Sequence, residues 1–76
     1  MMNVLLYGSK FCRGCRQAKK FMEENNVSFE YFDIEADKQY FDDYIKYGFK
    51  AVPLLVVNDI TVVGYDEEQY REKLGL

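Results

Sequence analysis

The chain has 76 residues, of which 49% are apolar and 30% charged, with a formal charge of −3 and a pI of about 4.8. A chain this short buries only roughly 60% of its unfolded surface, so we expect a single domain over residues 1–76. The acidic balance argues against nucleic acid or an anionic membrane as a partner. The apolar run at residues 4–7 is too short for a signal peptide or a membrane span. We therefore expect a cytoplasmic protein.

The first half of the chain predicts a strand, a helix and a second strand. Residues 3–7 form an almost continuous apolar run, which is typical of a strand buried on both faces. From Cys12 or Arg13 to Asn25, apolar residues recur every three or four positions, which predicts an amphipathic helix. The aromatic and β-branched residues of Val27–Ile34 indicate a second strand.

The second half predicts a helix, a hairpin and a last helix. Asp37 can cap the helix, and Gly48 lies just past its predicted end. The β-rich runs Leu54–Val57 and Ile60–Val63 are separated by only two residues, Asn58-Asp59, which is a hairpin signal.

The last helix and the order of all segments indicate the fold class. Asp66–Gln69 resembles a capping box, and the helix that it starts closes at Gly75. A strand–helix–strand start implies parallel pairing through a right-handed crossover, whereas the later hairpin is antiparallel. We expect an α/β fold in which three helices flank one mixed four-stranded sheet.

Positive charge gathers around the only two cysteines. Residues 1–20 contain five bases and no acid, whereas residues 21–76 contain the other five bases and all thirteen acids. A solvated basic helix face is the simplest explanation of such a cluster. The five bases are Lys10, Arg13, Arg16, Lys19 and Lys20.

The sequence Cys12-Arg13-Gly14-Cys15 is the candidate chemical centre. A Cys-x-x-Cys pair that follows a strand and opens a helix is typical of redox-active proteins. The helix N-terminus and the nearby cations favour the thiolate, so a thiol here ionises below its free pKa of about 8.5. Two intervening residues place the second sulfur about one helical turn away. We expect Cys12 to be the nucleophile and Cys15 the resolving thiol.

Other roles for the cysteine pair are less favourable. A disulfide across so tight a loop removes little entropy from the unfolded chain, which argues against a structural role. One chain with two cysteines and no histidine cannot supply the four ligands of a zinc site, so we expect no metal, although two chains could share one. Inert buried cysteines fit poorly with Arg13 beside Cys12.

The chain resembles the glutaredoxins from about Val4 to Leu74. The matching pieces are Tyr7…Cys12-x-x-Cys15-x-x-Ala18-Lys19, Val27-x-Phe29-Glu30…Asp33-Ile34, Gly48-x-Lys50-Ala51-Val52-Pro53 and Gly64-Tyr65-Asp66. The resemblance implies the thioredoxin-like fold with strand order 2-1-3-4, and a cis bond before Pro53. It also implies glutathione-dependent reduction of disulfides and of glutathionylated thiols, with glutathione as a co-substrate.

The same resemblance implies roles for residues around the cysteines. Lys10 and Lys50 would meet a glutathione carboxylate, and Val52 would pair with the backbone of the glutathione cysteine. The γ-glutamyl end would lie on Gly64-Tyr65-Asp66. We expect the rim of the site to include Tyr7, Lys10, Arg13 and Pro53, and the chain to act as a monomer on disulfide-containing or glutathionylated proteins.

Three departures from the family pattern keep alternatives open. Arg13-Gly14 replaces the usual Pro-Tyr, Ala51 replaces Thr, and Val63 replaces the first of two glycines. One alternative is a glutaredoxin-like redoxin that serves ribonucleotide reductase and is recharged by thioredoxin reductase. The other is a dimeric carrier of an iron–sulfur cluster ligated by glutathione, against which the bulky Arg13 argues. The match and the cations lead us to prefer the glutathione-dependent function.

Overall fold

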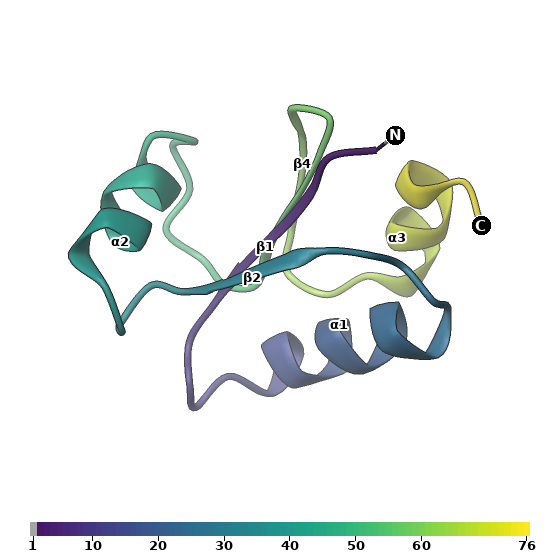
Figure 1. The fold of residues 1–76 in the computed structure, drawn as a ribbon, viewed down its shortest axis with the longest axis horizontal. Helices are drawn as coiled ribbons and strands as arrows, with labels where there is room; N and C mark the ends of the chain where they lie inside the picture. Colours follow the sequence, from purple (N-terminus) through teal and green to yellow (C-terminus); the bar gives the residue numbers. More distant parts are fainter. Residues whose placement is uncertain (1) are drawn as a thin grey trace.

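The computed structural model describes residues 2–76 and contains the seven predicted segments in the predicted order (Figure 1). No helix in this range is both long enough and apolar enough to cross a bilayer. The elements are β1 (Val4–Gly8), α1 (Arg13–Glu24), β2 (Glu30–Asp33), α2 (Lys38–Ile45), β3 (Leu54–Val57), β4 (Ile60–Val63) and α3 (Glu67–Leu74).

The four strands form one mixed sheet in the order β2-β1-β3-β4, which confirms the predicted architecture. β1 runs parallel to β2 and antiparallel to β3, and β4 pairs antiparallel with β3. β2 is shorter than the predicted Val27–Ile34, because only Glu30–Asp33 pairs with β1. Val27 and Phe29 precede this ladder and pack against the core instead.

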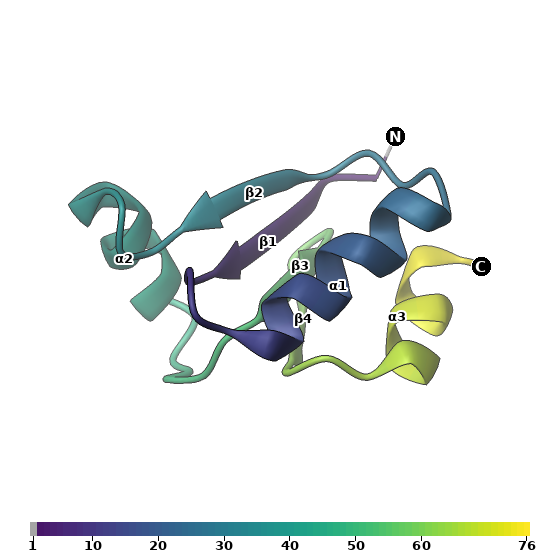
Figure 2. The ribbon, with the colours of Figure 1, turned by 90° about the horizontal axis from the view of Figure 1, so that it is seen from below.

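Each face of the sheet has its own apolar core. Helices α1 and α3 cover one face, and α2 covers the other (Figures 1 and 2). The α2 face is built from Tyr7, Tyr44, Leu54 and Val56. The α1–α3 face is built from Val4, Leu6, Ala18, Phe21, Met22, Leu55, Val57, Val62, Tyr70 and Leu74.

The turn and the helix ends follow the local chemistry of the sequence. Asn58 and Asp59 both have positive φ, 48° and 71°, as a two-residue hairpin turn requires. Asp37 caps α2 by accepting a hydrogen bond from the Gln39 N–H. The predicted capping box at α3 is only half formed. Asp66 accepts from the Gln69 N–H, but the Gln69 side chain bonds the Asp66 carboxylate rather than the Asp66 backbone.

Candidate active site

The two cysteines lie where β1 has ended and α1 begins, and they form a disulfide. Cys12 is the N-cap of α1, with extended backbone, and its Sγ accepts a hydrogen bond of 3.1 Å from the Cys15 N–H. Cys12 is partly exposed, whereas Cys15 is only 1% exposed. The sulfur that a partner can reach is therefore the one that the helix N-terminus stabilises as a thiolate.

Gly8 and Tyr31 surround the buried sulfur of Cys15. A Cβ atom placed on Gly8, the last residue of β1, would lie 2.9 Å from Cys15 Sγ and 2.6 Å from Tyr31 Oη. No side chain fits there, so the glycine allows the helix start to approach the sheet. Sequence reasoning missed both residues as neighbours of the site. A glycine that closes a buried strand was the only local signal.

Gly14 lies between the two cysteines and allows the start of α1 to approach the loop before β3. That loop passes the N-terminal end of α1 (Figure 2). A Cβ atom on Gly14 would lie 3.0 Å from Cδ of Pro53 and 3.8 Å from Cβ of Tyr65. The Val52–Pro53 bond is cis, as the family resemblance implied. Pro53, Tyr65 and the cysteine pair are therefore neighbours.

Val52, the residue before Pro53, presents backbone groups that have no partner in the described part of the chain. Its neighbours on both sides are fixed, because the Ala51 carbonyl accepts from Tyr44 Oη at 2.8 Å and the Pro53 carbonyl accepts from the Gly64 N–H at 2.8 Å. Within residues 2–76, the N–H and C=O of Val52 have no hydrogen-bond partner. This arrangement suits an extended peptide that adds its own backbone to the loop.

The cations around the disulfide are free of carboxylate partners. Within residues 2–76, none of the five bases of residues 10–20 lies within 4.0 Å of a carboxylate oxygen, although four other ion pairs form. A pocket of about 330 Å³ beside Cys15 is lined by Ser9, Lys10, Cys15, Arg16, Lys19, Tyr31 and Asp33. The local field therefore favours anions and thiolates.

Lys50 lines a different pocket from Lys10. It lies with Val52 at an apolar pocket of about 340 Å³ between α2 and the loop before β3. The other residues of that pocket are Ile34, Phe41, Tyr44 and Ile45. Lys10 lines the pocket beside Cys15, so the two lysines line different pockets.

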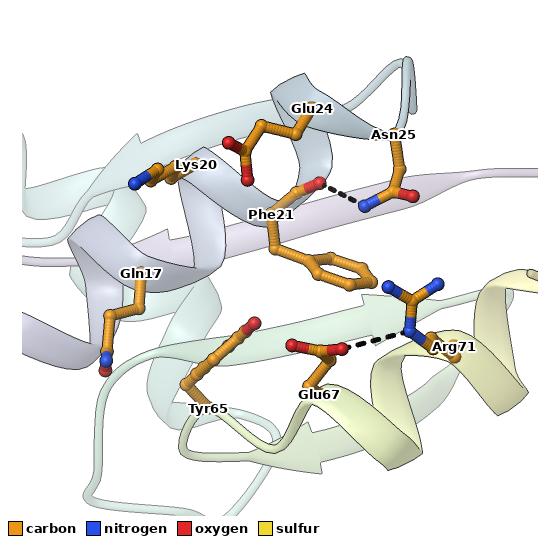
Figure 3. Close-up of a pocket in the computed structure, with 8 residues that line it drawn as sticks. All are labelled: Gln17, Lys20, Phe21, Glu24, Asn25, Tyr65, Glu67 and Arg71. Carbon is orange, nitrogen blue, oxygen red and sulfur yellow. Dashed lines mark hydrogen bonds and ion pairs between the residues drawn. The ribbon is translucent and has the colours of Figure 1, made fainter.

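The segment Gly64-Tyr65-Asp66 joins β4 to α3. Both oxygens of the Asp66 carboxylate are engaged by Gln69, one by the N–H at 3.3 Å and the other by Nε2 at 3.1 Å. The Tyr65 ring packs at 5.1 Å from the ring of Tyr70, and burial raises the pKa of its hydroxyl. Figure 3 shows Tyr65 at the pocket between α1 and α3, opposite Phe21.

Tyr7 does not lie on the rim of the site, where sequence reasoning placed it. Its side chain is 4% exposed and packs on the α2 face of the sheet, with its ring 5.2 Å from that of Phe32. Burial raises the pKa of Tyr7 to about 12, with a smaller contribution from Tyr47. Side chains alternate along a strand, so Tyr7 faces away from the α1 side that Gly8 faces.

The side chains around the cysteine pair are those of a redox centre. Within residues 2–76, no group of three or more His, Cys, Asp or Glu is placed to hold a metal ion. The chemistry that the site offers is thiol–disulfide exchange at a partly exposed sulfur, next to unpaired cations and a free stretch of backbone.

The comparison with protein families supports this chemistry. The family model described as Glutaredoxin matches residues 4–62. The glutaredoxin-like protein NrdH of Lactococcus lactis subsp. lactis is 26% identical over 62 residues, which cover 82% of this chain and 86% of that protein.

Solved structures share the whole fold. The thioredoxin-like protein BC3987, in the form of a point mutant, superimposes with a TM-score of 0.93 at 26% identity, over 99% of this chain and 97% of the other. The glutaredoxin grx-1 of Archaeoglobus fulgidus superimposes with a TM-score of 0.86 at 30% identity, over 97% and 87%. The predicted thioredoxin-like fold is confirmed.

Proposed function

This chain belongs to the glutaredoxin family of thiol–disulfide oxidoreductases, and we propose that it is a dithiol redoxin that receives its electrons from thioredoxin reductase. The observation that carries this choice of donor is the engagement of the Asp66 carboxylate by Gln69. The similarity to a glutaredoxin-like protein NrdH supports the same choice, because it favours the redoxin alternative drawn from the sequence.

The reaction uses the different exposure of the two sulfurs. The Cys12 thiolate attacks a substrate disulfide, forms a mixed disulfide and releases one substrate thiolate. The Cys15 thiolate then attacks Cys12 Sγ, forms the Cys12–Cys15 disulfide and releases the second substrate thiolate. The substrate gains two electrons, which the reductase later restores to the cysteine pair. Because Cys15 is 1% exposed, only Cys12 meets the protein partner.

Asp66 offers glutathione fewer open acceptor sites than an unpaired carboxylate would. In the glutathione-dependent function, the γ-glutamyl amino group would need the Asp66 carboxylate as a hydrogen-bond acceptor. Gln69 already donates to both oxygens, so glutathione would have to displace the Gln69 side chain or share the carboxylate with it. The side chain of Val63, which is 43% exposed, also replaces a glycine beside this site. We therefore place thioredoxin reductase before glutathione as the electron donor, which reverses the preference drawn from the sequence.

The protein substrate presents its disulfide in an extended segment. The free N–H and C=O of Val52 would pair with that segment and align its sulfur with Cys12. Ribonucleotide reductase is the substrate that we place first, because the redoxin alternative that the NrdH similarity favours serves it.

Glutathione remains the second candidate electron donor, and the free cations favour it. Lys10, Arg13 and Arg16 are exposed near the disulfide, and glutathione carries two carboxylates. In this function, a glutathione thiolate would attack the mixed disulfide on Cys12 directly.

The test is NADPH oxidation in the presence of a small disulfide, with thioredoxin reductase alone or with glutathione and glutathione reductase. We expect turnover with thioredoxin reductase, and loss of all turnover in Cys12→Ser. Cys15→Ser, the matched control, should lose turnover with thioredoxin reductase, and only the second candidate would leave it a glutathione-dependent route. Turnover with glutathione alone would replace the first candidate by the second, and an active Cys12→Ser would contradict the assignment of the nucleophile.

A further inference from the structure

We propose that the hydroxyl of Tyr31 donates a hydrogen bond to the Cys15 thiolate whenever the Cys12–Cys15 disulfide is open. This inference rests on the proposed role of Cys15 as the buried, resolving thiol. It assigns a function to a β2 residue that lies 16 positions beyond Cys15 in the sequence.

The two cysteine sulfurs have unequal hydrogen bonding in the disulfide. Cys12 Sγ accepts from the Cys15 N–H at 3.1 Å. Across residues 2–76, Cys15 Sγ accepts no hydrogen bond, although Cys15 is 1% exposed. A thiolate released at so buried a position needs a donor, because burial disfavours the charged form.

Tyr31 is placed to be that donor. Its Oη lies 2.6 Å and Cys15 Sγ 2.9 Å from the point where a Cβ on Gly8 would be, so the two atoms are at most about 5.5 Å apart. In the part of the chain that the structure describes, Tyr31 Oη also has no hydrogen-bond partner. Once the S–S bond opens, Cys15 Sγ is no longer held toward Cys12 and can turn to the hydroxyl.

The surroundings keep the hydroxyl protonated and the thiolate stable. Burial, and then Asp33, raise the pKa of Tyr31, so it stays a donor at neutral pH. Lys19 lies 4.3 Å from the centre of the Tyr31 ring, and Lys10 and Arg16 line the same pocket. These three cations favour a thiolate at Cys15, and Asp33 opposes it.

The proton and electron balance of the step is simple. When a reductase thiolate attacks Cys12 Sγ, a new S–S bond forms to Cys12 and the Cys12–Cys15 bond breaks. The electron pair stays on Cys15 as a thiolate, which accepts the hydrogen bond from Tyr31 without taking its proton. When the protein reduces a substrate, the same hydrogen bond raises the fraction of Cys15 that is deprotonated and can attack Cys12 Sγ in the mixed disulfide.

The test is the reaction of the fully reduced protein with the aromatic disulfide 5,5′-dithiobis(2-nitrobenzoate), followed by stopped-flow absorbance across a pH series. Attack by Cys12 releases one equivalent of coloured thiolate, and attack by Cys15 on the mixed disulfide releases the second. Tyr31→Phe should leave the first phase unchanged and move the pH midpoint of the second phase upward. If the midpoint rises by about one unit, the Cys15 thiolate fraction at pH 7 falls about tenfold, while each remaining thiolate becomes more nucleophilic. We therefore expect a second phase about threefold slower at pH 7.

A control and a second measurement separate the possible outcomes. Tyr40→Phe removes a hydroxyl from the ring that packs on Phe32, and it should change neither phase. Tyr31→Phe should also lower the midpoint potential of the cysteine pair, since a less stable Cys15 thiolate disfavours the reduced form. An unchanged pH midpoint and an unchanged potential in a folded Tyr31→Phe protein would overturn the inference. Persistence of the first phase in Cys12→Ser would instead overturn the proposed roles of the cysteines.

Discussion

Two glycines determine how tightly the chain closes around the cysteine pair. Gly8 lets Cys15 and Tyr31 approach the end of β1, and Gly14 lets the start of α1 approach Pro53. Neither residue has a positive φ, so the requirement is for space rather than for an unusual backbone conformation.

Gly8→Ala is expected to destabilise the protein. The added methyl group would lie 2.6 Å from Tyr31 Oη and 2.9 Å from Cys15 Sγ. The tyrosine hydroxyl can move, but the sulfur is held by the helix start, so we expect a loss of about 1–3 kcal/mol in the free energy of unfolding. Urea denaturation of the oxidised protein measures this loss. Ser28→Ala, at an exposed position, is the control, and equal stability of the two variants would contradict the packing argument.

The N-terminus of α3 depends on Asp66 as a helix cap. Asp66→Ala removes the acceptor of the Gln69 N–H and should lower the free energy of unfolding by about 1 kcal/mol. Asp66→Asn retains a capping oxygen and should stay within a few tenths of a kcal/mol. Thermal and urea unfolding measure both variants.

The Asp66 variants also bear on the electron donor. In our account the Asp66 carboxylate serves as a helix cap bonded to Gln69 and does not bind the electron donor. Turnover with thioredoxin reductase should therefore be unchanged in Asp66→Asn. If Asp66→Asn instead raised the KM for glutathione severalfold at unchanged stability, the carboxylate would be binding glutathione, contrary to our proposal.

The packing of α2 on the sheet carries a pH dependence through Tyr7. Between pH 10 and 12 the unfolded chain releases the Tyr7 proton and the folded chain keeps it, so raising the pH favours unfolding across that range. The shift from 10.0 to about 12 corresponds to roughly 2–3 kcal/mol of stability, present below pH 10 and lost by pH 12.

Tyr7→Phe should therefore lose less stability than the parent protein between pH 9 and pH 12. Urea midpoints at both pH values, compared between the two proteins, measure this difference and cancel effects common to both. An identical decline in the two proteins would indicate that Tyr7 titrates normally.

The elements were predictable because their signals are local. The period of the α1 sequence, the Asp37 cap and the Asn58-Asp59 turn each act within a few residues, and all three appear as predicted. The length of β2 was not predictable, because its pairing with β1, and not its own composition, sets where the strand begins.

The surroundings of the disulfide were only partly predictable. The roles that we propose for Cys12 and Cys15 follow from their order at a helix start. The contact of Gly8, Tyr31 and Cys15 joins β1, the start of α1 and β2, and Tyr31 lies 16 positions beyond Cys15, so no local pattern indicates it. The separation of Lys10 from Lys50 into two pockets likewise depends on the tertiary packing of α2.

At the scale of the whole molecule, the cations of residues 10–20 should govern reaction rates with charged disulfides. The reduced protein should react more slowly with an anionic aromatic disulfide as salt rises, because the Debye length falls from about 30 Å at 0.01 M to about 3 Å at 1 M. The neutral 2,2′-dithiodipyridine should show little change. Arg16→Gln should reduce the salt dependence, whereas Lys73→Gln, on α3, should not.

The most direct measurement is single-turnover reduction of the Cys12–Cys15 disulfide, without any substrate. The oxidised protein is mixed with NADPH and either thioredoxin reductase or millimolar glutathione plus glutathione reductase. The reaction is quenched with an alkylating agent, and the number of alkyl groups is measured by intact mass spectrometry. Our account predicts that two alkyl groups appear rapidly with thioredoxin reductase and much more slowly with glutathione. Rapid reduction by glutathione, with none by thioredoxin reductase, would contradict it.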